Sequence, residues 1–156
     1  MSIQKGQAAP DFNLINTEKE TVTLSGQKGK NVVLLFFPAA FTSVCTKELC
    51  NFRDNMSKYN DLNAQVYGIS VDLPFTLGEF KKQQNLNFPL LSDFNKEASK
   101  TYGCLYDNWI LGLKGVAKRS AFVIDKSGTI QYPEVLENAG DEPDYAKIDA
   151  ALASLN

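Results

Sequence analysis

The chain has 156 residues, of which 44% are hydrophobic and 22% are charged, and its net charge is -2. A chain of this length is the size of one ordinary domain and can form a stable core without disulfides. The composition excludes a disordered chain, and the slightly negative charge excludes the basic character of a nucleic-acid-binding protein. We therefore expect residues 1–156 to form a single domain with no affinity for nucleic acid.

The N-terminal segment and the cysteine content predict where the protein works. Residues 1–12 lack the apolar stretch behind a basic start that marks a secretory signal. The longest apolar run, at 32–41, contains a proline and is far shorter than the roughly 20 residues of a membrane-spanning helix. Three cysteines without a secretory signal indicate a reducing compartment. We expect a cytoplasmic protein that does not enter a membrane.

Hydrophobic periodicity predicts strands that alternate with helices and are followed by a hairpin and a terminal helix. In chain order, the predicted elements are strands at 11–14 and 21–24, a central strand at 31–37, a helix at 43–60, a strand at 65–71, a helix at 74–84, a strand at 89–91, a helix at 95–102, strands at 119–125 and 129–135, and a helix at 143–155. The first two strands form an N-terminal hairpin. This order predicts an α/β fold with a mixed central sheet flanked by helices, the thioredoxin-like arrangement with an N-terminal β-hairpin extension.

Cys45 is the candidate nucleophile. It lies in the first turn of the helix predicted at 43–60, directly after the central strand, where ligands tend to bind in α/β sheets. Free backbone N–H groups and the helix dipole favour a thiolate there. The chain has no histidine, which excludes Cys–His and Ser–His sites and the common zinc sites that contain histidine. Thr42 can present its hydroxyl beside the sulfur or act only as an N-cap, and Pro38 can exclude water from the loop or simply end the strand.

These residues carry a resemblance to a known family. The pattern Pro38-x-x-x-Thr42-x-x-Cys45 is similar to the active-site signature of the peroxiredoxins, the AhpC/TSA superfamily. Further similar stretches lie at 36–37, 88–93 and 119–128, so the resemblance runs nearly from end to end. It implies a thiol-dependent peroxidase that reduces hydrogen peroxide and organic hydroperoxides and holds no metal and no organic cofactor.

The resemblance also implies a role for each site residue. Cys45 would be the peroxidatic nucleophile, and the Arg119 guanidinium would stabilise both the thiolate and the charge that moves onto the leaving oxygen. Thr42 and backbone N–H groups would hold the peroxide in line. Glu48 would orient an arginine without contacting the substrate itself. The implied catalytic residues are Cys45, Cys50, Thr42, Arg119 and Pro38, and the implied substrate contacts are Thr42, Val44, Cys45 and Arg119.

Cys50 follows Cys45 by five residues, a spacing that resembles the Q-type, or bacterioferritin comigratory, branch, where the second cysteine resolves the sulfenic acid. A thioredoxin- or glutaredoxin-like protein would then reduce the disulfide. On an ideal helix this spacing gives a rise of about 7.5 Å and separates the two Cα atoms by roughly 8.6 Å. That exceeds the limit of about 7 Å for an unstrained disulfide. We therefore predict that the first turns of the helix unwind before Cys45 and Cys50 can join.

Several alternatives stay open. The stretches 87–94 and 98–103 are more similar to the one-cysteine branch of alkyl hydroperoxide reductase E, in which an external thiol would resolve Cys45 and Cys50 would only pack in the core. A thiol-disulfide oxidoreductase of the same fold would carry a Cys-x-x-Cys pair, but position 42 is threonine. A non-enzymatic interaction protein would have a Cys45 thiol that ignores peroxide.

The third cysteine and the end of the chain lead to two further expectations. Cys104 follows a glycine and precedes a leucine, and we expect it to pack in the core or in a loop. The chain carries no cysteine-bearing C-terminal arm, which disfavours a disulfide between subunits. We therefore expect a monomer or a homodimer.

Overall fold

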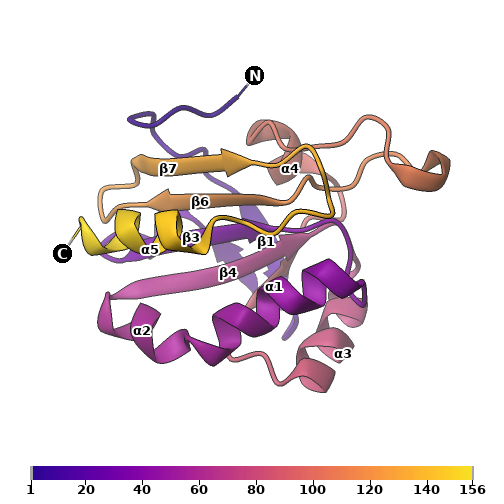
Figure 1. Cartoon of the computed structure of the whole chain (residues 1–156), viewed down its shortest axis with the longest axis horizontal. Helices are drawn as coiled ribbons and strands as arrows, with labels where there is room; N and C mark the ends of the chain where they lie inside the picture. The colour runs from indigo at the N-terminus through magenta and orange to yellow at the C-terminus, as the bar shows by residue number, and fades with distance from the viewer. Residues whose placement is uncertain (1, 156) are drawn as a thin grey trace.

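The computed structural model describes residues 2–155, which form a seven-stranded mixed sheet with helices packed against it (Figure 1). In order across the sheet, the strands are β2 (Thr21–Thr23), β1 (Asn13–Asn16), β5 (Leu90–Ser92), β4 (Ala64–Ser70), β3 (Asn31–Phe36), β6 (Ser120–Ile124) and β7 (Ile130–Val135). β4 pairs in parallel with both β3 and β5, and all other neighbouring strands are antiparallel. The mixed sheet and the N-terminal hairpin predicted from the sequence are both present.

Residues 2–155 also form five α-helices and two short 3₁₀ turns. They are α1 (Ser43–Asp54), α2 (Met56–Asp61), α3 (Pro74–Gln84), α4 (Glu97–Thr101), α5 (Tyr145–Ala153), η1 (Ser25–Gln27) and η2 (Ile110–Gly112). All of them lie between strands except α5, which follows β7. Apart from the helix predicted at 43–60, every predicted element is found within two residues of its expected bounds. Within the described part of the chain, no helix is long and apolar enough to cross a membrane.

β3 lies at the centre of the core, and its side chains are buried on both faces of the sheet. Val33 and Leu35 pack in a cluster to which α1, α2, α3 and α5 contribute. Val32 and Leu34 pack in a second cluster with residues of the N-terminal hairpin and α4. Because water reaches neither face, the strand is a continuous apolar run rather than an alternating one.

The prediction of one continuous helix at 43–60 is wrong, because α1 ends at Asp54 and α2 begins at Met56. Asn55 between them has φ -110° and ψ 15°, and its side-chain amide donates to the Asn51 carbonyl oxygen at 2.8 Å. Asparagine side chains compete with the backbone in this way, which favours them at helix ends. The apolar spacing continues across the break, since Met56 and Tyr59 pack in the same cluster as α1, so periodicity alone did not indicate it.

Candidate active site

The loop between β3 and α1 places Cys45 at the carboxyl end of the central strand. The Ala40 N–H donates to the Asp72 carboxylate at 2.8 Å, and the Thr42 hydroxyl donates to the Ala39 carbonyl oxygen at 2.7 Å. Thr42 is the N-cap residue of α1 by position, but its side chain forms no cap hydrogen bond. These contacts hold the loop so that Cys45 sits in the first turn of α1, where it is only 1% exposed.

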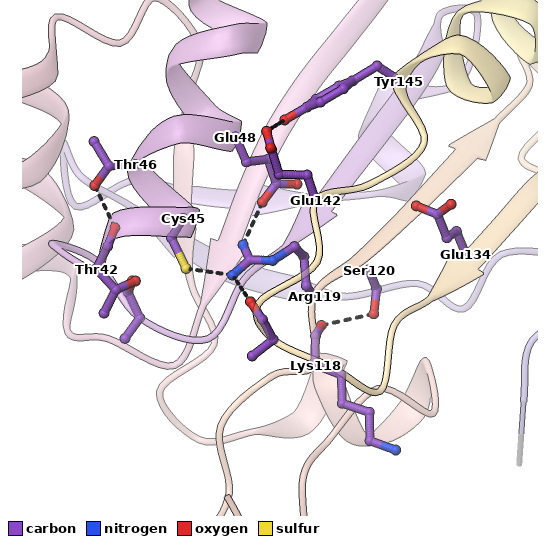
Figure 2. A network of polar contacts seen from close by, with 12 residues as sticks. Thr42, Cys45, Thr46, Glu48, Lys118, Arg119, Ser120, Glu134, Glu142 and Tyr145 are labelled. Carbon is purple, nitrogen blue, oxygen red and sulfur yellow. Dashed lines mark hydrogen bonds and ion pairs between the residues drawn. The ribbon is translucent and has the colours of Figure 1, made fainter. Parts of the chain in front are cut away.

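Arg119 reaches the same point from a distant part of the sequence. β6 runs antiparallel to β3 with Ser120 opposite Phe36, so the residue before β6 lies beside the β3–α1 loop. Arg119 Nη2 donates to Cys45 Sγ at 3.3 Å, and Nη1 donates to Glu48 Oε1 at 2.8 Å (Figure 2). Nη2 also donates to the carbonyl oxygen of Ala139 at 2.9 Å. The fold therefore brings Cys45, Glu48 and Arg119 into one cluster.

Glu48 and Arg119 form a buried ion pair behind the sulfur, with side chains that are 0% and 2% exposed. Burial raises the pKa of Glu48 to about 7, and attraction by Arg119 offsets only part of this effect. Burial alone would lower the pKa of Arg119, but attraction by Glu48 and Cys45 outweighs it and raises that pKa. The guanidinium is therefore a permanent positive charge beside the sulfur.

A pocket of about 620 Å³ opens at Cys45. One wall is the β3–α1 loop and the start of α1, and it includes the predicted site residues Pro38, Thr42, Val44 and Cys45. Arg119 also lines the pocket. Two further segments complete the pocket, and the sequence patterns predict neither of them as part of the site. They contribute Tyr106, Asn108, Trp109 and Ile110, and Glu137, Asn138, Ala139 and Gly140.

One sequence signal could have pointed to the first of these segments. Trp109 is the single tryptophan of the chain, and an apolar Ile-Leu pair follows it within a stretch that forms no predicted element. No comparable signal marks Ala139, because its carbonyl group takes part through the backbone. Among residues 2–155, no group of three or more His, Cys, Asp or Glu side chains is placed to hold a metal ion.

The other two cysteines lie apart from this cluster. Cys50 is half-buried on α1, and its thiol donates to Gln84 Oε1 at 3.5 Å. Cys104 is fully buried in the core cluster on the opposite face of the sheet from Cys45, as expected for a packing residue. Burial raises the pKa of Cys104 to about 12. All three cysteines are free, and α1 is continuous from Cys45 to Cys50.

Comparison with known proteins identifies the family. Residues 5–133 match the model of the AhpC/TSA family. The chain belongs to the AhpC/TSA family. Alkyl hydroperoxide reductase E from Mycobacterium bovis is 38% identical over 153 residues, which cover 96% of each chain. Peroxiredoxin Q, chloroplastic, from Oryza sativa subsp. japonica is 41% identical over 130 residues, which cover 83% of this chain and 58% of the rice protein.

The fold of this peroxiredoxin matches those of solved relatives. This chain aligns with the crystal structure of Peroxidoxin BcpB from Mycobacterium tuberculosis with a TM-score of 0.87 and 30% sequence identity, and the alignment covers 99% of each chain. The resemblance predicted from the sequence is thus confirmed, as is the thioredoxin-like α/β fold. The protein is a thiol peroxidase whose substrate is a hydroperoxide.

Proposed function

We propose that Cys45 is the peroxidatic cysteine of this peroxiredoxin and that Arg119 activates it. The observation that carries the proposal is the 3.3 Å contact between Arg119 Nη2 and Cys45 Sγ in a buried cluster. The Cys45 thiolate attacks the terminal oxygen of hydrogen peroxide or an organic hydroperoxide. An S–O bond forms as the O–O bond breaks, and the leaving oxygen takes up a proton to give water or an alcohol. Cys45 is oxidised by two electrons to a sulfenic acid.

The surrounding groups bind the peroxide and stabilise the charge that moves onto its leaving oxygen. Thr42 donates its only hydroxyl proton to Ala39, so its oxygen is left to accept a hydrogen bond from the peroxide. The N–H groups of Val44 and Cys45 lie in the first turn of α1, where no preceding turn supplies a carbonyl partner, and they can donate to the peroxide oxygens. Pro38 is buried at the pocket wall and limits the access of water.

Glu48 acts on the reaction through Arg119. The Glu48 carboxylate accepts a hydrogen bond from Arg119 Nη1, and Nη2 donates to both the Ala139 carbonyl oxygen and Cys45 Sγ. Two fixed acceptors thus hold the guanidinium plane in the orientation that directs one N–H group at the sulfur. Such preorganised charge costs no reorganisation at the moment of reaction, which is why it lowers the barrier.

We propose that Cys50 resolves the sulfenic acid: its sulfur attacks the sulfur of Cys45, the disulfide forms and water leaves. A thioredoxin- or glutaredoxin-like dithiol protein then reduces the disulfide, and the enzyme works as a monomer or homodimer in the cytoplasm. Because both cysteines belong to the same intact helix, the first turns of α1 must unwind before the bond can form. The alternative is a one-cysteine cycle with an external thiol, and the hydrogen bond that holds Cys50 to Gln84 favours it.

The mass of the intact protein after one equivalent of hydrogen peroxide tests this mechanism. Loss of two hydrogens, mapped to Cys45 and Cys50, supports the two-cysteine cycle. In that case the Cys45→Ser variant shows no mass change, and the Cys50→Ser variant gains one oxygen instead of losing two hydrogens. Oxygen addition at Cys45 in the unmodified protein supports the one-cysteine cycle instead. A Cys45 that stays reduced overturns the peroxidatic assignment.

Amide hydrogen exchange tests the unwinding step. If Cys45 and Cys50 join, the amides of the first turns of α1 are expected to lose protection, whereas oxidised Cys50→Ser keeps the protection of the reduced protein. A disulfide-bonded protein in which α1 stays fully protected would contradict the proposal.

A further inference from the structure

Two buried acids share one buried cation in the active site. Arg119 carries a permanent positive charge, whereas Cys45 and Glu48 each gain a negative charge when they lose a proton. All three side chains are buried. Arg119 contacts Cys45 Sγ at 3.3 Å and Glu48 Oε1 at 2.8 Å through two different nitrogens. A buried charge is costly unless an opposite charge balances it, so one guanidinium fully compensates only one of the two anions.

Glu48 has a hydrogen-bond donor for only one of its two carboxyl oxygens. Oε1 accepts from Arg119, whereas Oε2 is buried and has no hydrogen-bond partner among residues 2–155. An ionised carboxylate spreads its charge over both oxygens, so a buried oxygen without a donor disfavours the ionised form. A neutral carboxyl group carries no net charge and still accepts from Arg119 through Oε1. Oε2 is therefore the atom at which a proton is best held.

The neighbours on the other side of Glu48 also disfavour a negative charge on it. Besides Cys45 and Arg119, the titratable groups that face Glu48 are Glu134 in β7, Glu142 in the loop before α5 and Tyr145 in α5 (Figure 2). Burial has the largest effect on the pKa of Glu48, and repulsion by Glu134 and Glu142 raises that pKa further. The Tyr145 hydroxyl donates to Glu142 at 2.7 Å, and Lys47 pairs with Glu142 at 3.0 Å, so neither serves Glu48.

We propose that Cys45 and Glu48 share one proton, and that Glu48 takes up this proton when Cys45 becomes the reactive thiolate. The inference rests on the proposed role of Cys45. In the reactive state Arg119 balances the thiolate, and the neutral Glu48 carboxyl group still orients the guanidinium through Oε1. Because Glu48 is then uncharged, it does not compete with the sulfur for the positive charge. Two acids that interact this closely titrate as a pair rather than independently.

The oxidation of Cys45 then balances within the site. The sulfur donates an electron pair to an oxygen of hydrogen peroxide, the O–O bond breaks, and the hydroxide that leaves takes up one proton to become water. The sulfenic acid carries no charge, so Glu48 gives up its proton and becomes the anion that Arg119 compensates. For each Cys45 oxidised, one proton passes from Glu48 to the leaving oxygen. When the reductant restores the Cys45 thiol, its ionisation returns a proton to Glu48.

Carbon-13 NMR of the glutamate side chains tests the inference, because the chemical shift of a carboxyl carbon reports whether the group is protonated. The Glu48 signal is identified as the one missing from Glu48→Gln. The reduced protein and Cys45→Ser are titrated under the same conditions. The serine hydroxyl stays neutral, so no second anion competes for Arg119 in this variant. The midpoint pH for ionisation of Glu48 is expected to be lower in Cys45→Ser by about one pH unit or more.

Cys50→Ser is the matched control. It makes the same exchange of sulfur for oxygen on the same helix, but Cys50 contacts Gln84 rather than Arg119. The midpoint of Glu48 in this variant is expected to stay within about 0.3 pH unit of that in the unmodified protein. A carboxylate that served only to orient Arg119 would have one midpoint in all of these proteins.

The other outcomes overturn the inference or its basis. Equal midpoints in the unmodified protein and Cys45→Ser refute the shared proton and leave Glu48 as a support for Arg119 alone. A fall in Cys50→Ser as large as in Cys45→Ser also refutes it, because the change would then not depend on the charge at Cys45. The mass of the same protein after treatment with hydrogen peroxide tests the proposed function separately. A Cys45 that stays reduced overturns the peroxidatic role whatever the titration shows.

Discussion

Replacing Arg119 with lysine keeps a positive charge at the site but removes the planar fork of the guanidinium. Arg119 serves three acceptors from two nitrogens: Glu48 from Nη1, and Cys45 and Ala139 from Nη2. The single ammonium of lysine cannot reproduce this fixed geometry. We expect the ammonium to stay with the Glu48 carboxylate, so that the sulfur of Cys45 loses its contact.

The magnitude follows from the contact that is lost. A hydrogen bond to a charged group contributes about 1.5–3 kcal/mol, and each 1.36 kcal/mol in the barrier changes a rate about tenfold. The rate constant for oxidation of Cys45 by hydrogen peroxide is therefore expected to fall about 10- to 100-fold in Arg119→Lys. Because the buried Glu48 keeps a cationic partner, the free energy of unfolding should fall by only about 1–3 kcal/mol.

Stopped-flow fluorescence of Trp109, the single tryptophan and a residue of the same pocket, provides the assay, with chemical denaturation as the measure of stability. Arg53→Lys is the matched control, because Arg53 is the only other arginine of the chain and donates to the Gln84 carbonyl oxygen rather than to Cys45. It should leave the rate within about twofold. A folded Arg119→Lys protein that reacts as fast as the unmodified one would refute the role assigned to the guanidinium.

Three further predictions concern acidity and packing. Burial raises the pKa of Glu48 from 4.5 to about 7, so the folded protein holds this proton more tightly than the unfolded chain. The free energy of unfolding should therefore fall as the pH rises from 4.5 to 7, by up to about 3 kcal/mol relative to Glu48→Gln; parallel pH profiles in chemical denaturation would contradict this. Burial raises the pKa of Cys104 to about 12, so iodoacetamide at pH 8 should modify Cys104 only in denaturant, and modification of the native protein would argue against its burial. Phe122 is fully buried against Phe36 and Tyr102, so Phe122→Ala should cost about 3–5 kcal/mol in denaturation experiments. Phe75→Ala, at a side chain that is 66% exposed, should cost less than about 0.5 kcal/mol, and equal losses in the two variants would contradict the packing argument.

Local patterns were sufficient to predict the elements and the position of Cys45. A continuous apolar run identifies β3, and the residues that follow it start α1 within one turn of Cys45. These features depend on neighbours in the sequence, so a short window contains the information. Apolar spacing did not predict the break at Asn55, because a side-chain hydrogen bond, rather than a change in that spacing, ends α1.

The family resemblance predicts a catalytic role for Arg119. The residues next to Arg119 in the sequence would instead favour an exposed side chain at the start of a strand. Its burial follows from the pairing of β6 with β3, which sets Ser120 opposite Phe36 and leaves the preceding side chain beside the β3–α1 loop. The Ala139 carbonyl oxygen that holds its Nη2 lies on yet another segment, after β7. Strand register depends on long-range packing, and no local window encodes it.

The sequence by itself thus determined the family, the order of the elements and the cysteine at the start of α1, because periodicity, helix starts and an active-site signature are local properties. Only the tertiary structure decided that Glu48 and Arg119 form a buried pair behind that cysteine, and that Trp109 lines its pocket. These residues are far apart along the chain, and their side chains meet because the strands and loops pack in one particular order around the common core.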